Sequence, residues 1–396
     1  IINSAIMQLH PNDKTHKYRV LYGTPILGIR EGNFIVGEQS VTFLDYLNDN
    51  LTQEPLFYAY SNIDNHGKDI ALESEAQQDW VMVASFWGLN FSVPVPLGAL
   101  IPKGFDGIIT AGRCLSMDHD IAPCIRMIRD MQKCGEAAAL IAFAAICDNI
   151  AVKDVSYDKM LPLLLENKCL DKANDVKQVL IVDKHKHELN TTFTWSTNKD
   201  EIKQGLESDK PGIAIWSAKR MKDEIITDLK AWIKQDDINL KRHSAMALGL
   251  LGDKDALPLL RQMAQEKDTF VPKTSRKYNQ SRGLASIYLL GKLKDAESLP
   301  MLLEIVRSDK DFKTTNYNFD EFIPVVEEYY FQYFSQALMA LFKIGQEYEQ
   351  TRSIIAQTLK ERVFDKDFSI LITFKETKYH IHPMTDKIRG IVSDKL

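Results

Sequence analysis

The sequence predicts an α/β part followed by an all-α helical-repeat part. Short runs rich in aromatic and β-branched residues alternate with helical segments over the first 150 residues. From about residue 209 an apolar helix–turn–helix pattern recurs, which is typical of a helical-repeat array. We therefore expect an α/β part at 1–150, a connecting helix and β-hairpin region at 151–208, helical repeats at 209–362 and a β-rich tail at 363–396.

Composition excludes several functional classes. The 396 residues carry a net charge of −5, with 26% charged residues, so neither nucleic-acid nor membrane binding is expected. No apolar run approaches the length of a membrane span. The five cysteines show neither disulfide nor metal-site spacing, and we interpret them as small buried hydrophobes. Cys114, beside Arg113, is the only cysteine for which a functional role is a plausible alternative.

The most informative stretch runs from residue 101 to 148. A Pro-Lys-Gly turn leads into Gly107–Ala111, which has the length and β-branched content of a buried strand. Gly112 ends that run, a polar loop follows from Arg113 to Asp120, and a helix rich in alanine and glycine comes next. In α/β units ligands bind beyond the carboxyl end of the strand, near the next helix N-terminus. The sequence therefore predicts a ligand loop over Gly112–Arg126.

Apolar spacing predicts the remaining elements of the α/β part and of the connecting region. Pro94 and Pro96 favour an edge position for the strand that contains them. The last two predicted strands read as a hairpin that separates the two parts. The predicted strands are Tyr18–Tyr22, Leu56–Ile63, Val81–Val95, Val176–Val182 and Thr191–Trp195, and the predicted helices are Thr42–Asn50 and Tyr157–Glu166.

The later sequence contains four related helix pairs. The clearest are Ala247–Met263 and Leu289–Ile305, in which Pro258 corresponds to Pro300 and Asp253 to Asp295. The pattern resembles HEAT repeats, with a period of about 40–47 residues, and predicts a stacked solenoid. Ile213–Ile233 and Phe334–Leu359 are the other two copies. Two polar insertions, Lys267–Asn279 and Asp309–Glu321, are expected to be solvated loops, with a binding surface as the alternative.

Three motifs in the first 150 residues carry a family resemblance. They are GIREGNFIVGE at 28–38, IDNHG at 63–67 and IPKGFDGIITAGRCLSMDHDIAPCIRMI from residue 101. In this order they resemble the carboxyl-terminal flavin-binding segment of the FAD-dependent oxidoreductase family that contains fumarate-reductase-like flavoproteins. The resemblance implies a partial FAD/NAD(P)-binding Rossmann-like domain, with the Ala-Gly-Arg loop along the flavin. The implied cofactor-binding residues are Ala111, Gly112, Arg113, Cys114, Arg126, Met127 and Ile128.

Four side chains are candidates for catalysis or substrate binding. Arg30 belongs to the family's Arg-Glu pair, and the alternative is that it forms only a solvated ion pair in a loop. His66 is two residues from Asp64, and the alternative is that both belong to a structural turn. His119 lies between Asp118 and Asp120, which favour its charged form, so it is a proton donor, a substrate anchor or an exposed loop histidine. Arg126, in the first turns of the helix, opposes the helix dipole and needs an anionic partner.

The chain departs from the family in one respect, because it contains no G-x-G-x-x-G. Either it is a carboxyl-terminal piece of a longer protein, which we favour, or the cofactor site has been lost. Without the phosphate cradle we expect this chain alone to bind FAD weakly or not at all. No metal site is expected, since the H-x-H pairs at 185–187 and 380–382 lack supporting ligands and read as solvated strand.

Two functions from different classes follow. The first is a flavoprotein oxidoreductase that acts on a small-molecule substrate, with the helical repeats as scaffold or protein-partner surface. The second is a non-enzymatic helical-repeat interaction protein fused to a degenerate flavoprotein-like domain. The Ala-Gly-Arg loop with Arg126 favours the first, and the absent glycine motif favours the second.

Overall fold

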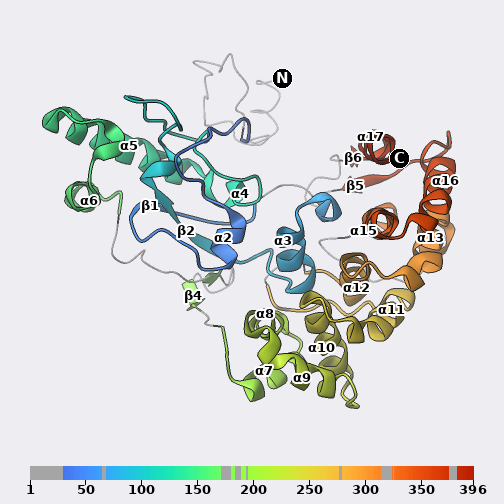
Figure 1. The fold of residues 1–396 in the computed structure, drawn as a ribbon. Coiled ribbons are helices and arrows are strands. Elements are labelled where there is room, and N and C mark those ends of the chain that lie inside the picture. Colours follow the sequence, from blue (N-terminus) through green and yellow to red (C-terminus); the bar gives the residue numbers. More distant parts are fainter. Residues whose placement is uncertain are drawn as a thin grey trace, which may run out of the picture.

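The computed structural model describes most of the chain and divides it into an α/β part and a helical part (Figure 1). The predicted strand Tyr18–Tyr22, His66 and the histidines at 185, 187 and 380 lie outside the described residues. The described ranges are 30–64, 68–170, 180–182, 189–192, 195–275, 279–313, 323, 325–373 and 381–396.

The described strands of the α/β part form one antiparallel sheet in the order β1-β2-β3-β4. The strand β2 pairs with β1 along its length and with β3 only at Asn90. Pro94 and Pro96 thus lie at the end of β2 that pairs only with β1. Because proline has no N–H, it would disrupt pairing with a second strand, and that end of β2 has none among the described residues. The predicted hairpin is β3 and β4, and it extends this sheet rather than separating the two parts. The strands are β1 (Pro55–Asn62), β2 (Asn90–Pro96), β3 (Leu180–Val182) and β4 (Leu189–Thr192).

Side-chain caps begin the short helices of this part. The Thr42 hydroxyl accepts from Asp45 N at 3.0 Å to start α2, and the Ser74 hydroxyl accepts from Gln77 N at 3.1 Å to start α3. The long helix α5 ends at Asn149, which adopts the left-handed conformation with φ 53°. The helices are α2 (Phe43–Leu47), α3 (Glu75–Gln78), the π turn η2 (Asp79–Val83), α4 (Ala122–Ile125), α5 (Ile128–Asp148) and α6 (Tyr157–Glu166). Single 3₁₀ turns are η1 (Ile70–Leu72), η3 (Leu97–Ala99) and η4 (Val152–Asp154).

The predicted strand Gly107–Ala111 is wrong, and the predicted strand Val81–Val95 is right only in its last part, where β2 begins at Asn90. Gly107–Ala111 forms no strand: Thr110 N bonds Leu100 O at 2.8 Å, but Ile108 is exposed and no ladder forms. The run that begins at Val81 is helical up to Val83, because η2 continues the helix that Ser74 caps. In both places β-branched composition was outweighed by local hydrogen bonding.

The helical part contains two helices in each of the four segments that share the repeat pattern. Pro258 and Pro300 lie in the first turns of α11 and α13, where proline loses no intrahelical hydrogen bond. In Figure 1 the helices follow one another in an arc. They are α7 (Lys199–Glu207), α8 (Gly212–Met221), α9 (Asp223–Trp232), α10 (Ile238–Leu250), α11 (Leu257–Gln265), α12 (Arg282–Lys292), α13 (Leu299–Arg307), α14 (Lys310–Lys313), α15 (Val326–Glu347), α16 (Arg352–Val363) and α17 (Thr385–Lys395). Turns η6 (Lys254–Ala256), η7 (Ala296–Ser298) and η8 (Glu349–Thr351) join pairs, and the tail pairs β5 (Leu371–Thr373) with β6 (Ile381–Pro383).

Residues 68–86 of the α/β part pack against the inner helices of the arc (Figure 1). At one end, Lys68 forms a buried ion pair of 2.5 Å with Glu328 of α15. In the middle, the Tyr288 hydroxyl of α12 donates to Asp79 at 2.6 Å. At the other end Gly212 of α8 lies against Ala84 O, at a place where a Cβ would come within 2.1 Å of that oxygen. This stretch of the inner surface is therefore occupied by the chain itself.

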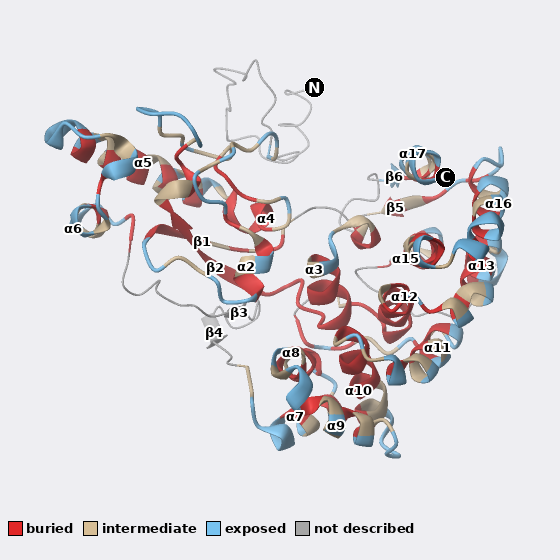
Figure 2. Cartoon of the chain, in the orientation of Figure 1, coloured by how far each residue is buried: buried red, intermediate tan, exposed pale blue. Residues whose placement is uncertain are grey.

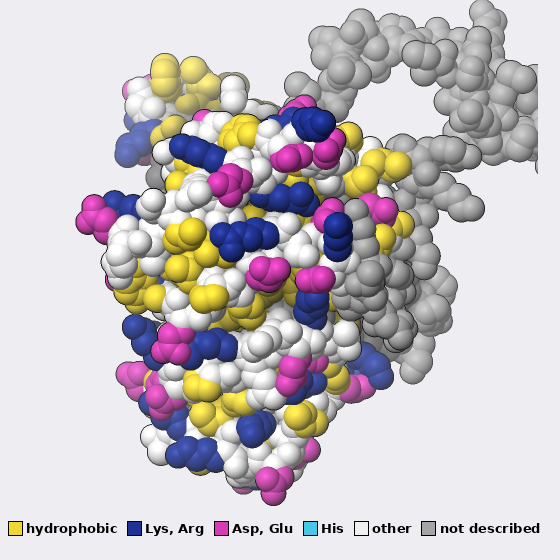
Figure 3. Space-filling view, turned by 90° about the vertical axis from the view of Figure 1, so that its right-hand side faces the viewer, with side chains coloured by type: hydrophobic (Ala, Val, Ile, Leu, Met, Phe, Trp, Pro, Cys, Tyr) yellow, Lys and Arg dark blue, Asp and Glu magenta, His cyan; other side chains and the backbone are white. Residues whose placement is uncertain are grey.

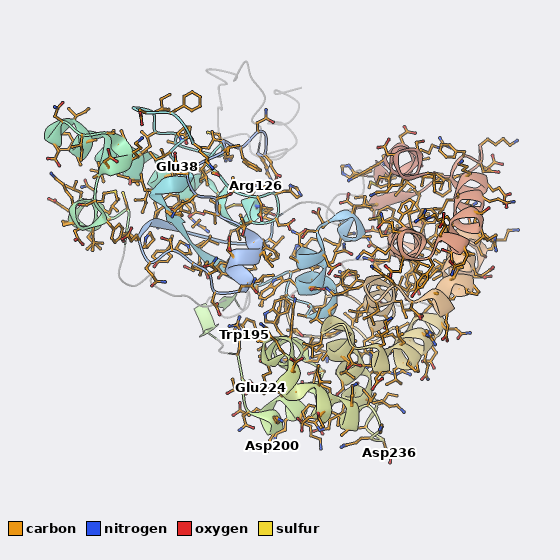
Figure 4. All side chains as sticks on the ribbon, in the orientation of Figure 1. Glu38, Arg126, Trp195, Asp200, Glu224 and Asp236 are labelled. Atoms are coloured by element: carbon orange, nitrogen blue, oxygen red, sulfur yellow. The ribbon has the colours of Figure 1, made fainter. Side chains whose placement is uncertain are left out.

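An aromatic cluster joins the two parts into one hydrophobic core. The backbone between the two parts is coloured as buried in Figure 2. Trp80 of η2 lies 4.5 Å from Phe86 and 4.8 Å from Trp216 of α8, centroid to centroid. Trp195, which Figure 4 places where the chain leaves the α/β part for α7, adds an edge contact with Trp80 at 6.1 Å. Such ring pairs stabilise beyond their burial by about 0.5–1.5 kcal/mol each.

The insertion after α11 is not the solvated loop expected from its composition. In its described part, the Thr274 hydroxyl accepts from Gly212 N at 3.1 Å, and Thr274 and Ser275 are buried. The outer face of the arc, seen in Figure 3, intersperses basic, acidic and apolar side chains without a single-sign field. Among the described residues, none of the helices combines the length and apolarity needed to cross a bilayer.

Candidate functional site

The loop after Thr110 is fixed between two other segments of the α/β part. Ser116 N donates to Ala99 O at 2.8 Å, and Val41 N donates to Ser116 O at 3.0 Å. Further along, Ile35 N donates to Cys114 O at 2.8 Å. These backbone bonds hold the Ala-Gly-Arg loop in place although no strand precedes it.

Glu31 brings two of the predicted site residues together. One carboxylate oxygen of Glu31 lies 2.9 Å from Nη1 of Arg126, and the other contacts Nδ1 of His119. Arg113 reaches the same group, because its Nε donates to the Arg126 carbonyl at 3.1 Å. The structure therefore brings Arg113, His119 and Arg126 together in one region of the α/β part.

Arg126 is the buried member of this group (Figure 4). Its side chain is 7% exposed, and Nη2 donates to the carbonyl of Asp64. Its buried Nε has no hydrogen-bond partner within the described part of the chain. Burial lowers the pKa of Arg126, while the nearby Glu31 and Asp64 carboxylates oppose that shift. The position differs from the prediction: Arg126 caps the end of α4 and precedes α5, rather than lying in the first turns of the long helix.

His119 sits between two carboxylates. Its Nε2 lies 3.1 Å from Glu73, and its Nδ1 faces Glu31. Burial lowers the pKa of His119, but the hydrogen bonds and charges of Glu31 and Glu73 outweigh it, so that the pKa is raised. Burial raises the pKa of Glu73, and His119 opposes that shift. In this arrangement His119 is a positioned cation with both ring nitrogens engaged.

Asp118 positions the loop rather than facing a ligand. Its carboxylate accepts from Phe43 N at 2.9 Å and from Ile121 N at 2.8 Å. Burial raises its pKa, and these two backbone donors oppose the shift. The carboxylate thus ties the start of α2 to the loop that carries His119.

The implied cofactor-binding residues form an open wall. Ala111 is exposed, and Gly112, at φ 99°, has no atom within 4 Å of the place where a Cβ would be. Helix α5 starts at Ile128, no side chain caps it at Met127, and Asp130 is the acidic residue of its first turn. Ile128, its first residue, is 74% exposed. Cys114, half-buried, lies next to this wall, with its Sγ 3.9 Å from Ala111 O.

Several large apolar side chains of the α/β part are exposed. Val36, Phe105, Ile108 and Ile128 are exposed on the described surface, and Phe143 and Ile146 continue the series along α5. Exposed apolar groups of this extent commonly mark an interaction surface or a ligand-binding groove.

The structure adds Asp130, which the sequence did not single out. Its buried carboxylate accepts from Tyr60 N at 3.3 Å and lies 3.5 Å from Nε of Arg129. Burial raises the pKa of Asp130 to about 6, and Arg129 opposes the shift. A carboxylate in the first turn of a helix is an ordinary dipole partner, so no sequence pattern marks this one as buried.

The remaining candidates divide as follows. Arg30 is exposed and close enough to Arg126 to lower its pKa by charge repulsion. His66 lies outside the described residues. Ligand atoms of Glu73, His119 and Asp120 lie within 4.8 Å of one another, but the ion pairs of His119 account for this grouping without a metal.

Comparison with known proteins gives one match. Residues 8–164, less than half of the chain, match the model of the family described as FAD dependent oxidoreductase. The match supports an oxidoreductase domain of the α/β flavoprotein type, for which FAD binding and a small-molecule substrate are general properties. None of the curated proteins and none of the solved structures matches the chain.

Proposed function

We propose that residues 30–164 form one wall of the flavin and substrate site of an FAD-dependent oxidoreductase. The observation that carries this proposal is the Glu31–His119–Arg126 group beside the open Gly112 turn and the uncapped start of α5. When bound, FAD supplies the hydride-transfer chemistry that side chains lack.

The residues of this wall have distinct roles in the proposal. Gly112 lets the loop backbone approach the flavin closely, because it alone tolerates φ 99° without strain. The free amides at the start of α5 face the electron-rich edge of the ring. Arg126, held by Glu31, supplies a fixed guanidinium, and His119, whose ring nitrogens face Glu31 and Glu73, holds a proton.

The opposite wall comes from a second polypeptide segment in this proposal. The sequence contains no G-x-G-x-x-G, so the pyrophosphate cradle has no candidate in it. The exposed apolar side chains of the α/β part support such a covering segment. We therefore interpret the chain as the carboxyl-terminal part of a longer flavoprotein, with the helical repeats as its scaffold.

Titration with FAD tests the proposal. The chain should bind FAD weakly or not at all, and extension with its upstream coding sequence should restore flavin absorbance near roughly 450 nm. In the extended protein, Ile128→Asp places a carboxylate at the start of α5 and should weaken FAD binding by at least about tenfold. An extended protein that stays colourless and takes up no added FAD would contradict the proposal.

Ile238→Asp is the matched control. Ile238 is the exposed first residue of α10, as Ile128 is of α5, and both aspartates complement a helix dipole. Ile238→Asp should leave FAD binding unchanged. Both variants should unfold at or above the wild-type midpoint, which separates a lost site from a lost fold.

The second candidate is a non-enzymatic interaction protein, and the absent glycine motif favours it. Its partner would need the outer face of the arc, since residues 68–86 occupy the inner helices. A colourless extended protein with an intact fold would favour this candidate.

A further inference from the structure

A cavity lies between the two parts, away from the proposed flavin wall. Its volume is about 530 Å³, within the usual range of about 300–1,000 Å³ for small-molecule sites. Helix α2 forms one side, α3 and the start of η2 form the second, and the end of α8 with Lys222 forms the third. The helical part and the α/β part therefore both contribute to it.

Positive charge is in excess around this cavity. Lys219 pairs with Asp79 at 2.9 Å, and Arg220 pairs with Asp49. Glu75 and Asp79, the acidic residues that line the cavity, also pair with Lys292, which does not line it. The distances are 2.6 Å to Glu75 and 3.0 Å to Asp79. Lys222 has no charged partner within the described residues. The cavity thus presents a cation without a counter-ion.

The side formed by α2 is apolar. Leu44 is 58% exposed and Leu47 is buried beneath it, so a ligand that covers Leu44 removes apolar surface from water. Ala76 continues the apolar surface on α3. Across from it, the Lys219 ammonium lies 4.2 Å from the centre of the Trp216 ring. A ligand with an anionic end and an apolar body matches both sides.

The backbone at Lys222 is strained. Lys222 has φ 52° and ψ −126° between α8 and α9, a conformation that glycine adopts far more readily. This lysine lines the cavity at some cost in backbone strain.

We propose that this cavity binds a small organic carboxylate with an apolar body. The carboxylate lies against Lys222 and Lys219, and the body covers Leu44 and Leu47. The cavity also contacts the supports of the His119 loop, since α2 begins at Phe43, whose N–H is held by Asp118. Occupancy of the cavity would thereby stiffen the loop from one side.

Calorimetric titration of the full chain with hexanoate tests the proposal. Hexanoate should bind, whereas hexylamine, with the same body and opposite charge, and inorganic phosphate, with no apolar body, should bind at least about tenfold more weakly. Equal binding of hexanoate and hexylamine, or of hexanoate and phosphate, would overturn the proposal, as would no hexanoate binding.

Two variants of cavity residues test where hexanoate binds. Leu44→Glu adds a carboxylate at an exposed position and should weaken hexanoate at least about tenfold. Lys222→Gly should weaken hexanoate similarly while the thermal midpoint stays equal or rises, because backbone strain is relieved. Lys234→Ala, which removes an exposed cation outside the cavity, should change neither quantity. Unchanged affinity in both cavity variants would overturn the proposal.

Discussion

Glu31 and Arg126 are 95 positions apart in the chain, and their side chains lie 2.9 Å from each other. This pair joins the segment that leads into α2 to the junction of α4 and α5. Because Arg126 also donates to the Asp64 carbonyl, one guanidinium connects three segments of the α/β part.

Replacing Arg126 tests that connection. Arg126→Ala leaves Glu31 and the Asp64 carbonyl without their donor and should lower the free energy of unfolding by about 2–4 kcal/mol. Arg126→Lys keeps the positive charge but loses the planar guanidinium that reaches both acceptors. It should lower the free energy of unfolding by about half as much. Urea denaturation measures both. Lys103→Ala, an exposed cation in the same part, should change stability by less than about 0.5 kcal/mol.

The protonation of His119 should follow its two carboxylates. Because its pKa is raised, its ion pairs stabilise the fold fully below the unfolded value of about 6.5 and are lost as pH rises through the folded value. Histidine NMR titration should show a pKa above that of an unperturbed histidine. Glu31→Gln and Glu73→Gln should each lower it. A pKa for His119 at or below the unperturbed value would contradict the ion-pair arrangement.

Asp130 should lower the free energy of unfolding at neutral pH. Its pKa of about 6 exceeds the unfolded value of about 3.9, so stability from this group falls as pH rises from about 4 to 6. Asp130→Asn keeps an acceptor for Tyr60 N and removes the charge. It should raise the unfolding free energy at pH 7.5 by about 1–2 kcal/mol more than at pH 4.5. An equal effect at both pH values would show that Asp130 is not perturbed.

Asp79 should couple the two parts in unfolding. It accepts from Tyr288, Lys219 and Lys292, all of which belong to the helical part. Asp79→Ala removes the carboxylate that pairs with Lys219 and leaves Tyr288 and Lys292 only their contacts with Glu75, so it should cost about 3–5 kcal/mol. Tyrosine-to-phenylalanine replacement at 288 should cost about 1–2 kcal/mol.

Two spectroscopic probes of unfolding show whether the two parts still unfold together. Tryptophan fluorescence and far-UV circular dichroism should report coincident transitions in the wild type and separated ones in Asp79→Ala. Glu75→Gln serves as the control, since that carboxylate is more exposed, and should leave the transitions coincident.

Periodicity predicted the helices well. Tyr157–Glu166 begins and ends at the residues expected, and Pro258 and Pro300 mark first turns, because proline and apolar spacing act locally. Propensity predicted the strands less well. Gly107–Ala111 has the composition of a strand but forms no ladder, and pairing is decided by other parts of the chain.

The sequence named Arg126 and His119 as candidates but identified only part of their surroundings. Arg126 was expected to need an anionic partner, and Glu31 is that partner, whereas the second carboxylate on His119, Glu73, lies 46 positions away and carries no local signal. One missed element had a readable signal. Ser74 and Gln77 form the S-x-x-Q pattern of a capping box, which marks the start of α3.

The aromatic cluster around Trp80 has a practical consequence for anyone who cuts this chain. Trp80 and Phe86 precede the connecting region, Trp195 lies within it and Trp216 follows it, and their rings are in contact. Expression of either half by itself would leave large indole and phenyl faces open to water and prone to aggregate. Crystallisation or binding work on a shortened version therefore has to keep residue 80 and residue 216 on one polypeptide.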